Sequence, residues 1–98
     1  MQINITREND TLTVAPEGFL DTMNAPEFSQ AVMDKLTDVK ELVIDFGKVE
    51  YISSSGLRVL IKLKGIMAGK GTMRLTGVNE IVMEVLEVTG LSGIFNIE

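Results

Sequence analysis

Apolar side chains alternate with polar ones over residues 2–7 and again over residues 11–17. The segment between these runs, REND, is rich in residues that favour turns. Alternation with a period of two is typical of strands that bury one face. The pattern therefore predicts an antiparallel hairpin that is ended by Gly18.

The next apolar residues recur at helical spacing. Asn24, Pro26 and Glu27 occupy the positions of an N-cap, a first-turn proline and the capping-box partner of the cap. An apolar stripe follows, made of Phe28, Val32, Leu36 and Val39. These positions predict one amphipathic helix with a single buried stripe.

A nearly continuous apolar run, residues 42–46, predicts a strand that is buried on both faces, as parallel strands under helices are. A loop through Gly47 and Tyr51 is expected to lead from this strand to Ser53-Ser54-Ser55-Gly56. A second amphipathic helix should follow, closed by Gly69 and Gly71. Its apolar stripe is Leu57, Leu60, Ile61, Leu63 and Met67.

The last third of the chain predicts one more strand and one more helix. The strand alternates around Arg74, and the helix is capped by Asn79 and stops at Gly90. Glu80, Glu84 and Glu87 form its solvated face, and residues 94–97 are a short strand or an extended tail. The predicted order, β-β-α-β-α-β-α with this terminal segment, favours parallel pairing from residue 42 onward.

Length and composition narrow the functional classes. The 98 residues fit one domain, and the chain has no cysteine and no histidine. A disulfide framework, a thiolate metal site and the common nucleophile–histidine catalytic sets are therefore excluded. Fourteen acidic and nine basic residues give a net charge of −5, which argues against nucleic-acid binding. Because these sets are missing, we expect a non-enzymatic domain with no cofactor. We expect it to be cytoplasmic, since no stretch resembles a signal peptide or a membrane span.

The serine cluster at residues 53–56 has two interpretations. Serine is a common helix N-cap, and the cluster fits a solvated, redundant cap. One serine suffices for a cap, however, and a phosphoserine in the first turn of a helix is stabilised by the helix dipole and by free N–H groups. Phosphorylation would add a charge felt mainly by a docked partner.

Three segments in the expected order resemble the STAS domain family, and in particular the anti-sigma factor antagonists of bacteria. The strand–loop–helix run LVIDF-GKVEYISSSGLRVL resembles the family's signature, GFLDTMNAPEF resembles its first-helix entry, and TGLSGIFNI resembles its C-terminal pattern. The resemblance covers essentially the full chain. It implies a single α/β STAS-like domain over residues 1–98, with a central mixed sheet of mainly parallel strands and helices packed mainly on one side.

The resemblance also implies a regulatory cycle. The phosphoacceptor would be the serine directly before the glycine, Ser55, with Ser54 as the alternative. The unmodified protein would bind an anti-sigma factor that is also a serine kinase, and so free the sigma factor. Phosphorylation would break this complex, and a phosphatase would reset it. The family often has an aspartate where this chain has Ser53.

The expected partner surface combines the serine cluster with the loop that precedes the first helix. Asp21 matches the family's acidic position in that loop, although it also fits a plain turn or cap residue. Arg58 could line a phosphate or contact a partner, and it equally fits an exposed helix arginine. The full expected set is Asp21, Thr22, Ser53, Ser54, Gly56 and Arg58.

Two other functions fit the same residues. The chain could be a stand-alone STAS docking subunit of a membrane transport complex, without inserting into the membrane itself. It could also sense a nucleotide or another small ligand at the helix start. A monomer is the simplest expectation for a charged domain of this size.

Overall fold

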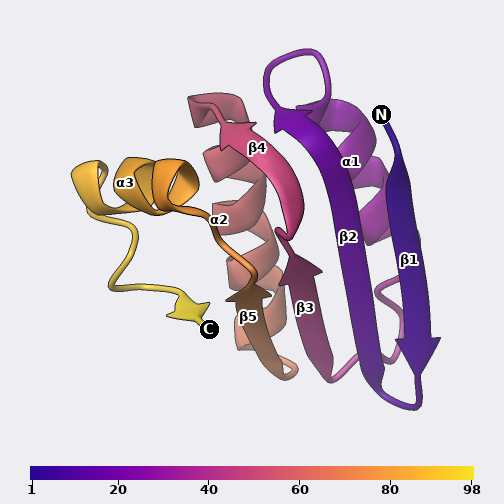
Figure 1. Ribbon diagram of the computed structural model, residues 1–98. Coiled ribbons are helices and arrows are strands. Elements are labelled where there is room, and N and C mark those ends of the chain that lie inside the picture. The colour runs from indigo at the N-terminus through magenta and orange to yellow at the C-terminus, as the bar shows by residue number, and fades with distance from the viewer.

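The alternating runs at the N-terminus form an antiparallel pair, β1 (Ile3–Glu8) and β2 (Thr11–Leu20), in the computed structural model, which describes all 98 residues (Figure 1). Asn9 and Asp10 join the two strands, and Asn9 has a positive φ of 56°, as a tight hairpin turn requires. Gly18 does not end the second strand, contrary to the prediction. It takes a φ of 93°, and β2 continues to Leu20.

The other strands pair in parallel on the far side of β2. β3 (Glu41–Asp45) pairs with the first half of β2, and β4 (Lys48–Ile52) pairs with its second half. β5 (Thr72–Thr76) pairs with β3, and β6 (Asn96–Ile97) pairs with β5. The predicted parallel pairing from residue 42 onward is therefore confirmed.

β4 was not expected, because residues 47–51 were predicted to be a loop. After β3, the Asp45 carboxylate accepts a hydrogen bond of 2.8 Å from the Gly47 N–H, and the chain then resumes its course along β2. Val49 and Ile52 are buried, which anchors β4 in the core. The two apolar residues are separated by two exposed ones, so the segment lacks the alternation of a regular strand.

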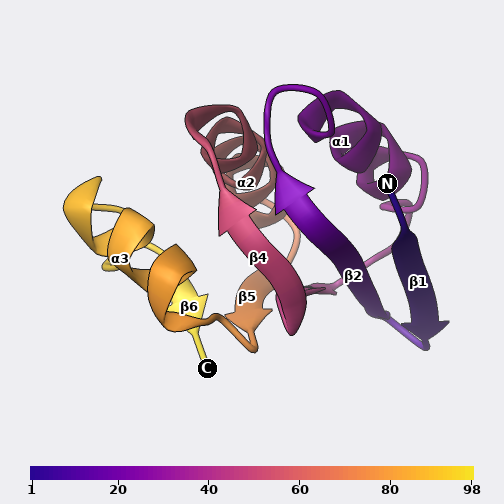
Figure 2. The ribbon, with the colours of Figure 1, turned by 45° about the horizontal axis from the view of Figure 1, so that its top comes forward.

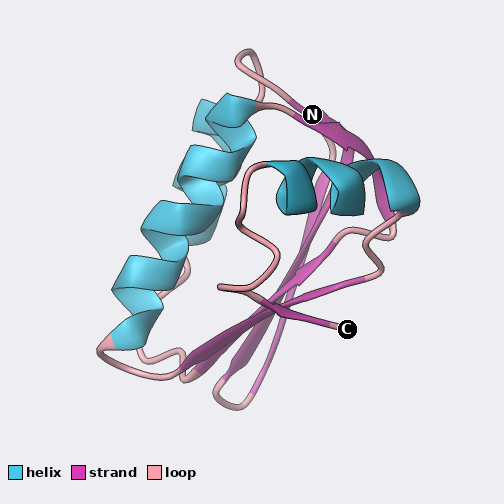
Figure 3. Cartoon of the chain, turned by 90° about the vertical axis from the view of Figure 1, so that its left-hand side faces the viewer, coloured by secondary structure: helices cyan, strands magenta, loops and turns pink.

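Two of the three helices cover one face of the sheet. These are α1 (Ala25–Met33) and α2 (Ser54–Ala68), which pack against each other and lie on one side in the nearly edge-on view of Figure 3. The third, α3 (Glu80–Val88), lies beside β4 at the edge of the sheet (Figure 2). A mixed sheet with helices mainly on one side is the predicted fold class, and it is confirmed.

α1 is shorter than its apolar stripe suggested. The helix ends at Met33, and Leu36 and Val39 are buried in the following turn instead of on a helix face. Asp38 has a φ of 62°, which no α-helix accommodates, and the Arg7 guanidinium donates to the carbonyls of Thr37 and Asp38. Burial therefore continues at a similar spacing after the helix has stopped.

The predicted caps differ in their outcome. Asn24 makes no capping bond with its side chain, which instead donates to the Phe19 carbonyl. Asn79 is the cap of α3, because its side-chain oxygen accepts from the Val82 N–H at 2.8 Å. Gly90 follows α3 with a φ of 77°, as a helix-ending glycine does.

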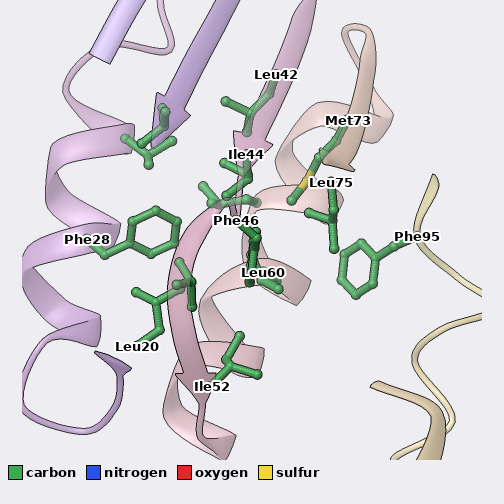
Figure 4. Close-up of a cluster of buried hydrophobic side chains, with 14 of the residues drawn as sticks. Leu20, Phe28, Leu42, Ile44, Phe46, Ile52, Leu60, Met73, Leu75 and Phe95 are labelled. Carbon is green, nitrogen blue, oxygen red and sulfur yellow. The ribbon is translucent and has the colours of Figure 1, made fainter. Parts of the chain in front are cut away.

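A single cluster of 21 buried apolar residues joins the sheet to all three helices. Phe28 of α1, Leu60 of α2 and Phe95 from the C-terminal segment point into it together with the strand residues (Figure 4). Leu20 and Ile52, the last residues of β2 and β4, are fully buried members. The core therefore holds in place the ends of the two strands from which the next segments emerge.

Candidate functional site

The site lies at the edge of the sheet where β2 and β4 end side by side, at the arrowheads near the top of Figure 1. Leu20 and Ile52 form the last pair of this parallel ladder. The residues that follow them, Asp21–Asn24 and Ser53–Ser55, must therefore emerge next to each other, although they are about 30 positions apart in the sequence.

A β-bulge sets the direction of the side chains that lead into the site. Val49 pairs with Gly18 but Tyr51 pairs with Phe19, so that Glu50 is the extra residue on β4. The insertion turns Tyr51 outward beside Phe19 and leaves Ile52 buried. Without it, the residues after β4 would leave the sheet with their side chains turned to the other face.

Ser55 lies in the first turn of α2, where its hydroxyl meets the neighbouring loop. Its Oγ lies 3.0 Å from Oγ1 of Thr22, a hydrogen bond in which either oxygen can donate. Ser55 is half-buried and Thr22 is exposed. The first-turn N–H groups and the helix dipole favour negative charge at this position. The Ser55 oxygen is thus at the surface, next to a helix start suited to an anion.

The other two serines of the cluster have different surroundings. Ser53 occupies the N-cap position of α2 but makes no capping bond with its side chain; its Oγ donates to the Leu20 carbonyl at 3.3 Å. Its N–H donates to the same carbonyl at 2.9 Å. Ser54 is exposed. None of the three serine side chains caps the helix, contrary to the simplest interpretation of the cluster.

Gly56 is needed for packing. A Cβ at this position would lie 2.8 Å from the Leu20 carbonyl oxygen and 2.7 Å from Cγ1 of Ile52. Gly56 is itself buried, so it brings α2 close to the ends of β2 and β4 and presents no surface of its own. Gly56 was expected to contact a partner, but its place in the structure is under the exposed residues of the site, where it packs against the strand ends.

The remaining predicted residues flank the serines. The Asp21 carboxylate accepts from the N–H groups of Met23 and Asn24, at 3.0 Å each, so it shapes the turn before α1. Arg58 is exposed, in no ion pair, and one helical turn beyond Ser55. The structure thus brings Asp21 and Thr22 beside Ser53, Ser54 and Ser55, with Arg58 on the adjoining surface of α2.

Sequence reasoning missed the aromatic pair next to the site. The rings of Phe19 and Tyr51 lie 6.4 Å apart with a tilt of 56°, and both side chains are about half exposed. No pattern indicated this pair, because it depends on the bulge at Glu50 and on the pairing of two distant strands.

The arrangement offers a surface for modification or docking. No three acidic, histidine or cysteine side chains lie close enough together to hold a metal ion. None of the helices has both the length and the apolar character needed to cross a membrane.

Comparison with known proteins agrees with this geometry. The sequence profile of the STAS domain matches residues 2–98. The chain is 30% identical over 96 residues to the anti-sigma-B factor antagonist of Listeria monocytogenes, a match that covers 94% of this chain and 82% of the relative.

Two solved structures have the same fold. An anti-sigma factor antagonist from Mycobacterium paratuberculosis superposes with a TM-score of 0.89 at 23% identity, covering 98% of this chain and 83% of the other. The Bacillus cell fate determinant SpoIIAA, in its phosphorylated form, superposes with a TM-score of 0.74 at 15% identity, covering 99% and 91%.

Proposed function

This chain belongs to the STAS domain family, as its sequence predicted, and from that membership we propose that it is an anti-sigma factor antagonist that acts by partner switching. In its unphosphorylated form it binds an anti-sigma factor that is also a serine kinase, and this releases the sigma factor. Phosphorylation of Ser55 abolishes the binding, and a phosphoserine phosphatase restores it. The chain acts as a regulator and as the kinase's substrate, and it performs no catalysis itself.

Two lines of support lead to this proposal. The relative from Listeria monocytogenes is named an anti-sigma-B factor antagonist, and SpoIIAA has been solved in a phosphorylated form. The observation that carries the proposal in this chain is the Ser55 hydroxyl, which lies at the surface in the first turn of α2 within 3.0 Å of Thr22.

The surroundings of the three serines favour Ser55 as the acceptor. The Ser53 hydroxyl is directed to the Leu20 carbonyl and is half-buried, so a phosphate there would displace a contact that holds the start of α2. Ser54 is exposed and remains the alternative acceptor. Only the Ser55 hydroxyl is tied to a side chain of the β2–α1 loop, so its modification alters both segments of the expected partner surface.

The switch is electrostatic. A phosphoserine carries about −1.5 to −2 charges at pH 7. The N-terminus of α2 partly stabilises that charge within the domain, so the fold is kept. A partner docked over the same surface would bury this charge, and removing an ion from water without a matching partner costs several kcal/mol.

The direct test is to map phosphorylation in cells that contain the cognate kinase. The purified protein should carry one phosphate on Ser55, and the Ser55→Ala variant should carry none. Ser54→Ala is the matched control and should be phosphorylated as the wild type is. A pull-down from the native cytoplasm, with and without phosphatase treatment, should recover the kinase only with the dephosphorylated protein. Phosphate on Ser54 alone would identify Ser54 as the acceptor in place of Ser55. Recovery of the kinase with both the phosphorylated and the dephosphorylated protein would refute the switch.

A further inference from the structure

A shallow groove of about 340 Å³ lies between β4 and α3, on the side of β4 that is turned away from the core. We call it the β4–α3 groove; its lining residues are Tyr51, Ile81, Glu84, Val85, Val88 and Thr89. None of them belongs to the predicted partner surface around Ser55. An inference about the groove therefore does not depend on the proposed function.

Two local features build the groove. The Asn79 side chain caps α3 with its oxygen and donates through Nδ2 to the Val49 carbonyl at 2.9 Å, which fixes the start of the helix against β4. The bulge at Glu50 turns Tyr51 out of the core, so that its ring forms one wall. The groove is therefore held by the backbone of β4 and by the cap of α3.

The groove is more apolar than the packing of α3 requires. Val82 and Leu86 already bury the inner face of the helix. Ile81, Val85 and Val88 form a second apolar stripe, in which Val88 is 80% exposed and Ile81 is 57% exposed. Apolar side chains gathered on a surface in this way mark interaction sites more often than single exposed ones do.

The charge on the α3 side of the groove has one sign. Glu80, Glu84 and Glu87 run along α3 beside the apolar stripe, and Glu84 is part of the lining. From residue 75 to residue 98 the chain has four glutamates and no lysine or arginine. An occupant must therefore supply apolar side chains and positive charge together.

We propose that the β4–α3 groove binds a short amphipathic helix of a protein partner, with apolar residues facing Tyr51 and Val88 and with lysine or arginine facing the glutamates of α3. α3 has nine residues, so it spans roughly 14 Å, which matches two to three turns of a bound helix. A second copy of this chain would bring like charges together, and an anionic lipid surface would be repelled by the same glutamates. Charge thus selects a basic segment as the occupant.

Tyr51 provides a reporter for the test, because it is the only tyrosine and the chain has no tryptophan. The probe is a synthetic helical peptide of about 12 residues made of leucine and lysine, without aromatic residues. Titration should change Tyr51 fluorescence saturably, and amide shifts in NMR spectra should cluster on β4 and α3. Val88→Ser and Ile81→Ser should each weaken peptide binding about fivefold or more. Both side chains are exposed, so the fold should be kept, and circular dichroism verifies this.

Matched controls separate the groove from general attraction to an acidic protein. Met23→Ser removes an apolar side chain that is 86% exposed outside the groove, and it should leave binding unchanged. Glu84→Lys should weaken binding much more than Asp10→Lys, which makes the same change of charge in the β1–β2 turn. Equal effects of the two lysine variants, or wild-type affinity of Val88→Ser, would overturn the proposal. So would a change in Tyr51 fluorescence with protein concentration alone, or with anionic vesicles in place of the peptide.

Discussion

The hydroxyl groups of Ser55 and Thr22 form the side-chain hydrogen bond that joins the start of α2 to the β2–α1 loop within the proposed site. The bond is exposed, so water competes with it and its net contribution to stability is small. Its importance is positional, because it gives the Ser55 oxygen a defined direction before any partner arrives. Phosphorylation removes the Ser55 proton and replaces this contact with a bulky anion.

Energetic coupling between the two hydroxyls can be measured directly. Thr22→Val and Ser55→Ala should each lower the free energy of unfolding by about 0.5–1 kcal/mol, since each removes the same hydrogen bond. The double variant should lose no more than the larger single loss, with a coupling energy of about 0.5 kcal/mol in urea unfolding. Thr22→Val combined with Ser54→Ala is the control and should be additive. Full additivity of the first pair would show that the bond is absent in solution.

A fixed negative charge at Ser55 should separate binding from folding. Ser55→Asp should weaken binding to the anti-sigma partner by about tenfold or more, because its carboxylate faces the docked surface. The melting temperature should stay within about 3 °C of the wild type, since an anion in the first turn of a helix is tolerated or slightly stabilising. Isothermal titration and thermal melts give the two values. Ser55→Asn is the matched control, because it has the same shape as Ser55→Asp without the charge. Wild-type affinity of Ser55→Asp would refute the electrostatic account.

The seating of α2 on the strand ends depends on a close approach of the backbone at Gly56. The helix begins where Ser53 donates twice to the Leu20 carbonyl, and Gly56 rests against that same carbonyl. These contacts position the whole first turn, including Ser55. A change in these contacts would therefore shift the Ser55 hydroxyl even though Ser55 itself is unchanged.

Alanine substitution at two glycines of α2 should therefore have opposite effects. Gly56→Ala places a Cβ 2.8 Å from the Leu20 carbonyl oxygen and should destabilise the protein by about 1–3 kcal/mol. Gly65→Ala meets no atom within 4 Å and should stabilise it by up to about 1 kcal/mol through helix propensity. Urea unfolding of both variants measures the difference. Equal effects would mean that α2 is not packed as closely as described.

The elements that could be predicted from the sequence are those with regular patterns. β3 was evident from its continuous apolar run and α2 from its long stripe, whereas β4 was missed because the bulge at Glu50 breaks its alternation. The end of α1 was placed too late, because the buried residues Leu36 and Val39 continue its spacing in a turn.

The acceptor serine and its neighbouring loop came from the family resemblance, and their role stays a prediction. The contact between Ser55 and Thr22 could not be predicted at all. It depends on the pairing register of two strands that lie far apart in the chain, and a register is a property of the folded sheet.

Across all 98 residues the charge is −5, and the basic side chains in ion pairs lie on the strands. Arg74 pairs with Glu41 and Glu98, and Lys48 approaches Glu17 at 3.8 Å. The remaining acidic surface produces a field that reaches beyond any single contact. Such a field accelerates the encounter with a basic partner more than it strengthens the final complex.

The association rate with the anti-sigma partner should therefore depend on salt and on where charge is changed. Raising the ionic strength from about 0.05 M to about 0.5 M should slow association about tenfold with little change in dissociation. At low salt, Glu50→Lys on β4 should slow association about threefold, because it lies close to the docking edge. Asp10→Lys makes the same change at the opposite end of β2, roughly 30 Å away and about two Debye lengths from the partner at this salt, and should have a much smaller effect. Stopped-flow measurements distinguish these cases. Equal slowing by both variants would indicate that the association rate depends on net charge alone. An association rate that rises with salt would contradict a basic partner surface.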